Sequence, residues 1–460
     1  MVFNLPILPI DTGRYGSSEI RQVFEEETRF QRMLDVEAAL AWARAEVGDI
    51  PKDAAIEIEE HASTKYVAVE RIHEIEKVTD HETAALVEAL AEASGKGGAY
   101  VHFGATSSDI LDTALALQMK EGLSIIRSKL DRLEGVLIEL SKKYRDTMMI
   151  GRTHGQHALP MTVGLKFAVW LSEVGRHIQR VDQCAARLLV GKMSGAIGTM
   201  AGLGKHGQQI QELTMKRLGL QSDAVTTQIV QRDRHAELVC TFAIVASSLD
   251  KFATEIRNLQ RPEIDELAEP FHEGKQVGSS AMPQKRNPWH SESISSLAKI
   301  ERSLVGPALE AVVTWHERDM SQSASERFII PESFVIIDHM LNSMIDILSG
   351  LNVNERRMSE NLTRFKEPLM AEAVLTALVD KGMARQEAHR LLRELVAESK
   401  DQDVAFHDVL ERNPIIGRFL AVDDIEALLD PEKYLGASKE LVDLAVEKAL
   451  AERRRRGLRA

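Results

Sequence analysis

Three segments of the chain repeat apolar residues at alternating steps of four and three. They run from Met119 to Leu140, from Val163 to Val181 and from Leu238 to Leu259. This spacing places the apolar side chains on one face of an α-helix. Helices of roughly 25–30 residues are about 40 Å long, and packing against one another removes such stripes from water. The pattern predicts a long antiparallel bundle, to which similar patterns at 290–314 and 330–350 add two helices.

The composition agrees with an all-α fold. Aromatic residues make up 5% of the chain, whereas good helix formers such as Ala, Leu and Glu abound. A chain of 460 residues is too long for one simple core. We therefore predict a helical N-terminal domain at 1–109, a central long-helix bundle at 110–361 and a helical C-terminal domain at 362–460. Long helices leave apolar area for partner subunits, so we expect an oligomer.

The net charge and the cysteine content indicate which kinds of partner and which cellular location to expect. The net charge of −13 argues against a nucleic-acid binder, which needs a basic face. We interpret Arg453–Arg456 as a solvated helix end. Cys184 and Cys240 form no CxxC pair, which favours a reducing, cytoplasmic location. Residues 1–10 lack a positive charge and contain two prolines, so we expect no signal peptide, and no stretch is long enough to span a membrane.

Polar loops separate the predicted helices, and bundle ends are where binding groups are usually placed. They are Gly104–Asp109, Gly151–Gln156, Ser194–Thr199, Thr226–Gln228 and 272–290.

The strongest chemical signal lies at 278–288. This stretch combines a glycine, two serines, two cations and two side-chain amides, and it ends at a proline. The upstream residues 272–275 predict a second hinge, as expected for a closing lid. Ser279 can act as a base only as an alkoxide, which needs a nearby ammonium such as Lys285 and N–H groups directed at its oxygen. The alternative is an ordinary polar loop, and the density of functional groups disfavours it.

The segments Thr106–Asp109, Thr153–Gln156 and 278–288 resemble the signature regions of the fumarase/aspartase superfamily. The resemblance covers most of the chain. It implies a homotetramer with a five-helix central bundle in each subunit, whose active sites are shared between three subunits.

Within that superfamily the chain resembles the members that cleave succinylated purine nucleotides. The markers are Arg14-Tyr15, Thr226–Gln228 with Gln231–Glu237, Lys285–Asn287, and Trp315–Asp319 followed by Ser323 and Arg327. The resemblance implies elimination of fumarate from adenylosuccinate, leaving AMP, and from the succinylo-aminoimidazole-carboxamide ribotide (SAICAR), leaving AICAR. It implies neither a cofactor nor a metal, because the substrate supplies its own electron sink.

The resemblance also implies residue roles. Ser279 would be the general base and His154 the general acid, with His81 assisting or binding phosphate and Lys285 among the catalytic groups. The implied phosphate ligands are Arg14, Tyr15, Ser323 and Arg327. The implied carboxylate ligands are Thr106, Ser107, Gln228, Ser280, Lys285 and Asn287. Asp80, Glu82, Arg286 and Arg318 complete the predicted substrate-binding set.

Two positions depart from the pattern. Glu82 follows His81 where an aspartate is usual, which puts the local hydrogen-bond geometry in doubt. Gln284 stands where a histidine or tyrosine is commoner, and glutamine there also occurs in argininosuccinate lyases. That activity is therefore a rival, although the Arg14-Tyr15 and Ser323/Arg327 pairs favour a phosphate.

The residues make chemical sense without the resemblance. Removing a proton beside a carboxylate develops a second negative charge, which fixed cations stabilise in the transition state. The cationic residues in the loops are Arg14, Arg152, Lys285, Arg286, Arg318 and Arg327. A histidine that titrates near neutrality suits protonation of the departing nitrogen.

Other interpretations fit less well. His154 and His157 could bind a metal, but no third ligand stands at a recognisable spacing. Gly202–Gly207 matches GxGxxG but lacks the surrounding βαβ pattern of a dinucleotide site. By default His235 is a structural histidine. A non-catalytic descendant of the fold is the alternative from another class, and the retained Ser279 and His154 disfavour it.

Overall fold

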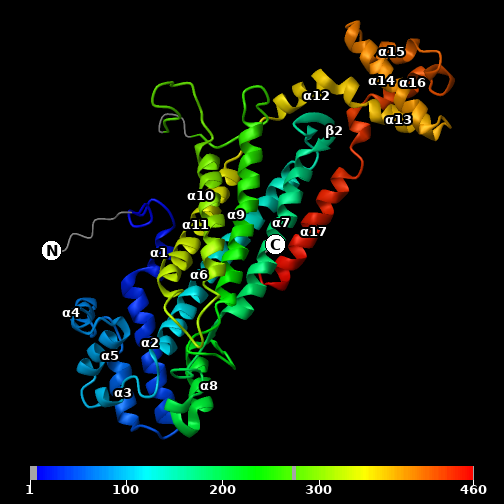
Figure 1. Cartoon of the computed structure of the whole chain (residues 1–460). Coiled ribbons are helices and arrows are strands. Elements are labelled where there is room, and N and C mark those ends of the chain that lie inside the picture. Colours follow the sequence, from blue (N-terminus) through cyan, green and yellow to red (C-terminus); the bar gives the residue numbers. More distant parts are fainter. Residues whose placement is uncertain (1–7, 272–275, 459–460) are drawn as a thin grey trace. The chain divides into compact units, whose positions relative to one another are not determined.

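The computed structural model describes residues 8–271 and 276–458, and it is dominated by helices (Figure 1). The five longest helices of the described residues are those expected of the bundle. They are α6 (Ser107–Lys143), α7 (Val163–Leu188), α9 (Asp233–Leu259), α10 (Trp289–Glu310) and α11 (Ser323–Ser349). The predicted all-α class is confirmed, and the three apolar stripes fall on α6, α7 and α9 with nearly all of their side chains buried.

The contacts divide the chain into two compact units, each built from three chain segments. The first comprises Met1–Asp131, His177–Lys251 and Ser293–Met344. The second comprises Arg132–Arg176, Phe252–Glu292 and Ile345–Ala460. The three predicted domains, which follow the chain in order, stay a prediction.

The first unit also contains eight shorter helical elements among its described residues. They are α1 (Ser18–Phe24), α2 (Glu26–Glu46), α3 (Lys52–His61), α4 (Val69–Thr79), α5 (Glu82–Ala93), η1 (Gly97–Tyr100), η2 (Ala201–His206) and α8 (Gly207–Leu218). Phe334 of α11 packs edge-on against Phe242 of α9, with ring centroids 5.0 Å apart. Gly122 lets the same ring approach α6, because a Cβ there would lie 2.8 Å from it.

The second unit contains a further helical core after residue 354. Its elements are α12 (Glu355–Leu369), α13 (Ala371–Asp380), α14 (Arg385–Asp401), α15 (Phe406–Arg412), η3 (Ile416–Arg418), α16 (Val422–Leu428), η4 (Pro431–Tyr434) and α17 (Ser438–Arg455). Helices α13 to α16 lie together (Figure 1) and share one apolar core. Trp170 of α7 stacks on Phe252 of α9 in the same unit, with centroids 4.7 Å apart.

Three pairs of short strands were not expected. Strand β1 (Met148–Thr153) pairs antiparallel with β2 (Gln156–Thr162), so the segment that we expected to be a plain loop is a hairpin. The other pairs are β3 (Val190–Gly191) with β4 (Gln221–Ser222), and β5 (Leu267–Ala268) with β6 (Asn352–Val353). Two-residue strands are defined by tertiary contacts, which leave no periodic signal in the sequence.

The basic C-terminal run is not simply solvated. Arg453 and Arg456 both pair with Glu134 on α6, whose side chain is only 1% exposed. These contacts fasten the end of α17, and the predicted free tail is wrong for these two residues.

Helix α11 corrects another expectation, because it is long and apolar enough to cross a membrane. However, 67% of its apolar window is buried within the protein. This is the burial of a core helix.

Candidate active site

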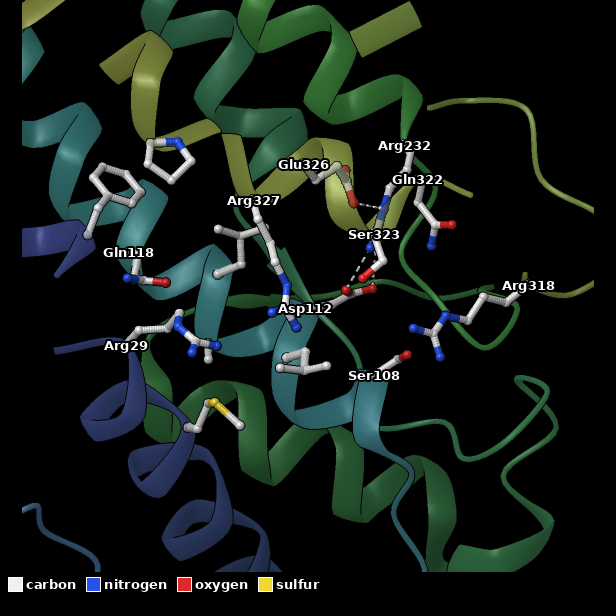
Figure 2. A pocket seen from close by; sticks show the side chains of 16 residues that line it. Arg29, Ser108, Asp112, Gln118, Arg232, Arg318, Gln322, Ser323, Glu326 and Arg327 are labelled. Carbon is white, nitrogen blue, oxygen red and sulfur yellow. Dashed lines mark hydrogen bonds and ion pairs between the residues drawn. The ribbon is translucent and has the colours of Figure 1, made fainter. Parts of the chain in front are cut away.

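A cavity of about 250 Å³ lies at the N-terminus of α11 in the first unit (Figure 2). The predicted residues Arg318, Ser323 and Arg327 line it together with Ser108 of α6. The N–H groups at the start of α11, which begins at Ser323, have no acceptor within the helix. The Ser323 N–H donates to the Met320 carbonyl at 3.2 Å, which leaves those of Ala324 and Ser325 for an anion.

A buried charge network forms one wall of this cavity. Arg232 binds both oxygens of Asp112, at 2.8 and 2.9 Å, and Glu326 at 2.9 Å (Figure 2). His235 hydrogen-bonds to Glu326 at 2.6 Å. Burial disfavours the charge on Asp112, but the Arg232 guanidinium outweighs this effect and lowers its pKa. The network ties α6 and α9 to the first turn of α11, and it fits the structural role expected for His235.

The hydrogen bonds that Arg318 makes within the described residues are to neutral groups, and the nearby Asp319 carboxylate interacts electrostatically with its charge. One terminal nitrogen donates to Gln228 Oε1 at 3.0 Å and the other lies 3.1 Å from the Met320 sulfur, so both partners are neutral. Two predicted substrate residues, Arg318 and Gln228, are therefore held together.

Glu82 begins α5 and carries the longer carboxylate noted above. Arg29 of α2 binds it with two hydrogen bonds, at 2.8 and 2.5 Å, and Arg327 lies 3.5 Å away. Burial disfavours ionisation of Glu82, but the Arg29 guanidinium overcomes this and lowers its pKa. Glu82 thus contacts two cavity-lining arginines.

A second cavity in the same unit, of about 400 Å³, brings together His81, Thr106 and Ser107. His81 is the N-cap of α5, and its Nδ1 accepts a hydrogen bond from the Ala84 N–H at 3.2 Å. Asp80 ends α4 in the left-handed conformation, with φ of 51°. The residues Asp80–Glu82 therefore form the tight turn between α4 and α5.

Asp109 fixes the predicted Thr106–Asp109 turn. Its carboxylate accepts from the backbone N–H groups of Thr106, Ser194 and Gly195, at 2.9, 2.8 and 3.1 Å. It also pairs with Lys192, and both side chains of this ion pair are fully buried. A buried charge with this many donors holds two loops in one arrangement.

Sequence reasoning missed Arg29 and His102. His102 lines the second cavity, has φ of 60°, and binds Glu37 through its ring and its backbone N–H, at 2.6 and 3.1 Å. Burial opposes its charge, but the Glu37 carboxylate outweighs burial and raises its pKa. The available signal was Glu37, a carboxylate on the apolar face of α2, which must have a partner.

Arg14 and Tyr15 precede α1 and do not line the described cavities. The Tyr15 ring meets His339 of α11 edge-on at 5.0 Å, and Arg14 is exposed. The following Ser17 N–H donates to Asp338 at 2.7 Å, and Asp338 also pairs with Lys129. This cluster anchors the segment to α11.

His154 occupies the turn of the β1–β2 hairpin in the second unit. Thr153 pairs with Gln156, and His154 and Gly155 between them have φ of 54° and 73°. Two consecutive positive φ values are typical of a type I′ turn, in which the first residue is held clear of the strands. The His154 side chain is exposed.

The segment 278–288, which we call the signature loop, folds back on itself in the same unit. The Met282 and Ala281 N–H groups donate to Ser279 Oγ at 3.1 and 3.4 Å. Asn287 Nδ2 donates to the Gly278 carbonyl at 2.9 Å, and a Cβ on Gly278 would lie 2.1 Å from the Lys285 carbonyl. Glycine is thus required where the two ends of the loop meet.

The remaining loop residues surround this crossing. Ser280 and Lys285 are exposed, while Arg286 and Asn287 line a cavity of about 300 Å³. The Arg286 guanidinium lies over the Phe271 ring, 5.0 Å from its centroid. The hinge predicted at 272–275 lies outside the described residues.

Arg152 is not the free cation that its loop position suggested. It binds Glu266 with two hydrogen bonds of 2.7 Å, and Glu266 is completely buried. Its charge is used to hold the hairpin.

One group of possible metal ligands comes together within the described residues. His407, Asp408 and Glu411 lie at the surface of α15, and none of them belongs to the predicted site.

The predicted residues thus gather in two sets. The first unit holds His81, Glu82, Thr106, Ser107, Gln228, Arg318, Ser323 and Arg327 around its cavities. The second unit holds His154 on the hairpin and Ser279–Asn287 on the loop. No hydrogen bond joins Ser279 to His154 in the described residues, and the expected convergence of the two sets at a shared site stays a prediction.

Comparison with known proteins places the chain among enzymes. A lyase family model matches residues 13–300, and a model of the adenylosuccinate lyase C-terminus matches residues 368–445. A fumarate lyase from Mesorhizobium sp. BNC1 superposes with a TM-score of 0.88 at 34% identity, covering 96% of this chain and 100% of that one. The 3-carboxy-cis,cis-muconate lactonizing enzyme from Pseudomonas putida gives 0.87 at 31%, covering 96% and 99%. The fold and these matches define a lyase of the fumarase/aspartase superfamily, as predicted.

Sequence relatives show to which family within this superfamily the chain belongs. Adenylosuccinate lyase from Pyrococcus abyssi is 49% identical over 454 residues, which cover 99% of this chain and 100% of that protein. The enzyme of the same name from Methanothermobacter thermautotrophicus is 46% identical over 438 residues, covering 95% and 97%. The chain belongs to the adenylosuccinate lyase family.

Proposed function

We propose that this protein eliminates fumarate from adenylosuccinate, leaving AMP, and from SAICAR, leaving AICAR. The family membership supports a carbon–nitrogen lyase acting on a small molecule, since full-length relatives at 41–49% identity carry the name adenylosuccinate lyase. The observation that carries the choice of substrate is the cationic cavity at the start of α11.

That cavity suits a nucleotide phosphate. Arg318 and Arg327 supply positive charge, Ser323 supplies a hydroxyl, and the N-terminus of a 27-residue helix supplies N–H groups. A guanidinium can bind phosphate oxygens in pairs, which favours arginine at such a site. Arg14 and Tyr15 join this site in our proposal, through the segment anchored to α11 by Ser17.

The chemistry starts at Ser279. Two N–H groups already donate to its oxygen, and these stabilise the alkoxide that forms when the Ser279 hydroxyl loses its proton to solvent. The alkoxide takes the proton from the succinyl carbon beside a carboxylate, which restores the hydroxyl. Negative charge then develops on that carboxylate, where Lys285 and Asn287, with Thr106, Ser107, Gln228 and Ser280, hold it. Arg286, Asp80 and Glu82 shape the surrounding pocket.

His154 completes the elimination. As the carbon–nitrogen bond breaks, His154 gives a proton to the departing nitrogen, which is on the purine in adenylosuccinate and on the carboxamide in SAICAR, and fumarate is formed; His81 assists or binds phosphate. A left-handed turn presents the His154 ring to solvent, which suits delivery of a proton to a ligand bound elsewhere. No cofactor takes part in this scheme.

The site is shared in a homotetramer in our proposal. Apolar side chains are exposed on and near α10 and α11, and a second copy would remove them from water. They include Ile300, Leu309, Val312, Val313 and Phe328, which are 40–69% exposed. The charge of −13 supports neither nucleic acid nor an anionic membrane surface as a partner, and we place the enzyme in the cytoplasm.

Purified enzyme given adenylosuccinate or SAICAR should release fumarate, with argininosuccinate as the control substrate. Ser279→Ala should abolish turnover and still bind substrate, because it removes the base and leaves the cations. Turnover of argininosuccinate alone, or near-normal turnover by Ser279→Ala, would contradict the proposal.

A further inference from the structure

Gln322, the residue before α11, carries a buried amide without a partner. Its side chain is 1% exposed, and Oε1 has no hydrogen-bond partner in the described residues. The backbone of Gln322 is well fixed, because its carbonyl accepts from the Glu326 N–H at 3.1 Å and from Ser325 Oγ at 2.9 Å. An amide buried without a partner destabilises the folded state, and a ligand that hydrogen-bonds to it would remove that cost.

The unpaired amide faces a ligand site. Gln322 lines the cavity at the start of α11, and Figure 2 shows it on the same side as Arg318 and Ser323. The Nε of Arg318 is also buried, and within the part of the chain that the structure describes it has no hydrogen-bond partner. The same side of the cavity therefore carries an acceptor on Gln322 and a donor on Arg318 (Figure 2), neither of which has a partner in the described residues.

Gln118 provides a comparison within the same cavity. It lies on the opposite side in the view of Figure 2, and its Nε2 donates to the Val23 carbonyl at 2.7 Å. The protein itself therefore provides a hydrogen-bond partner for the side chain of Gln118, and among the described residues it provides none for Gln322 Oε1.

We propose that Gln322, with Arg318 Nε–H, binds a ribose hydroxyl of the substrate and selects ribonucleotides over deoxyribonucleotides. An ionised phosphate or carboxylate only accepts hydrogen bonds and cannot satisfy Oε1. A hydroxyl donates to Oε1 and accepts from Arg318 Nε–H at once. Gln322 directly precedes Ser323, which our proposed function assigns to the phosphate, and the sugar is the hydroxyl-bearing group attached to that phosphate. The inference rests on that assignment.

Binding of AMP, 2′-deoxy-AMP and 3′-deoxy-AMP by calorimetry tests this, with the wild type and Gln322→Met. The wild type should prefer AMP to at least one deoxynucleotide by about tenfold. Gln322→Met is similar in shape but lacks the amide, and it should lose that preference. It should bind AMP about tenfold more weakly than the wild type does, while its affinity for the deoxynucleotide should stay within about twofold of the wild-type value. Gln118→Met, whose lost partner is a backbone carbonyl, should keep the preference.

Unchanged AMP affinity in Gln322→Met, or equal loss for all three nucleotides, would overturn the inference. Thermal unfolding gives a second readout: ligand-free Gln322→Met should melt at the same or a higher temperature than the wild type, because an unpaired buried amide has been removed. A lower melting temperature with the preference intact would show that the amide has a structural partner. Failure of wild-type turnover would instead contradict the proposed function.

Discussion

Glu82 binds Arg29 through both carboxylate oxygens, at 2.5 and 2.8 Å, and the same carboxylate lies 3.5 Å from Arg327. The extra methylene at this position thus belongs to a side chain that reaches two arginines of one cavity. Since Glu82 directly follows His81, the bridge also fixes the start of α5.

Glu82→Gln should lower the free energy of unfolding by about 1–2 kcal/mol at pH 7, because the pair is partly buried and hydrogen-bonded. The folded-state pKa of Glu82 is lowered, so its contribution is present above the unfolded pKa of about 4.3 and is lost as pH falls through the folded value. Urea unfolding should show that the difference in free energy of unfolding between the wild type and Glu82→Gln becomes smaller in acid. A gap of equal size at pH 3 and pH 7 would contradict this. Glu82→Asp, which keeps the charge, is the matched control.

Asp109→Asn should destabilise the protein by about 3–5 kcal/mol, because it leaves the fully buried Lys192 ammonium without its counter-charge. Adding Lys192→Met should recover part of this loss, since no buried charge remains. Denaturant unfolding of the single and double variants measures both effects. Equal stability of Asp109→Asn and the wild type would show that the pair does not hold the Thr106 turn.

Glu301 of α10 predicts a pH effect of the opposite sign. Burial, which exceeds the opposing effect of its hydrogen bond from Ser333 at 2.6 Å, raises its pKa to about 8. The folded state therefore holds a proton that the unfolded state loses near pH 4.3, and stability falls as pH rises through the folded value. The free energy of unfolding of Glu301→Met should therefore rise relative to that of the wild type, by a few kcal/mol at most, between pH 5 and pH 9. Melting curves that keep a constant separation over this range would exclude a protonated Glu301.

Sharing of the site between subunits predicts complementation. Ser279→Ala and His154→Ala should each be nearly inactive, since each lacks one proton-transfer group. Mixed and allowed to exchange subunits, the two variants should regain a fraction of wild-type activity, because some sites then combine an intact serine with an intact histidine. Ser279→Ala mixed with itself under the same conditions is the control. No recovery in confirmed mixed tetramers would argue against shared sites.

The long helices could be predicted because their apolar residues repeat with the helical period, and burial of Ile126, Phe167 and Phe242 follows from that repeat alone. The β1–β2 hairpin could not, since its turn residues are His154 and Gly155 and its strands lack clear alternation. The short strand pairs depend on which segments meet in space, and one sequence does not contain that information.

The sequence marks 278–288 as a candidate site by its unusual density of functional groups, and the role of this segment stays a prediction. Sequence could not tell which loop cations form buried ion pairs in the fold. Arg152 and Arg327 look equivalent as loop cations, yet Arg152 forms a close ion pair with the fully buried Glu266, whereas Arg327 lies 3.5 Å from Glu82 and its side chain remains 62% exposed. Asp109 belongs to the resemblance motif, and its contacts are all structural.

The N-cap bond of His81 dictates the tautomer of that ring. Because Nδ1 accepts from the Ala84 N–H, a neutral imidazole must carry its hydrogen on Nε2. The neutral ring can then donate to an anionic ligand from Nε2, and the helix sets the orientation of this donor. To take a proton from a ligand through Nδ1, the ring would have to leave the cap and expose the first turn of α5.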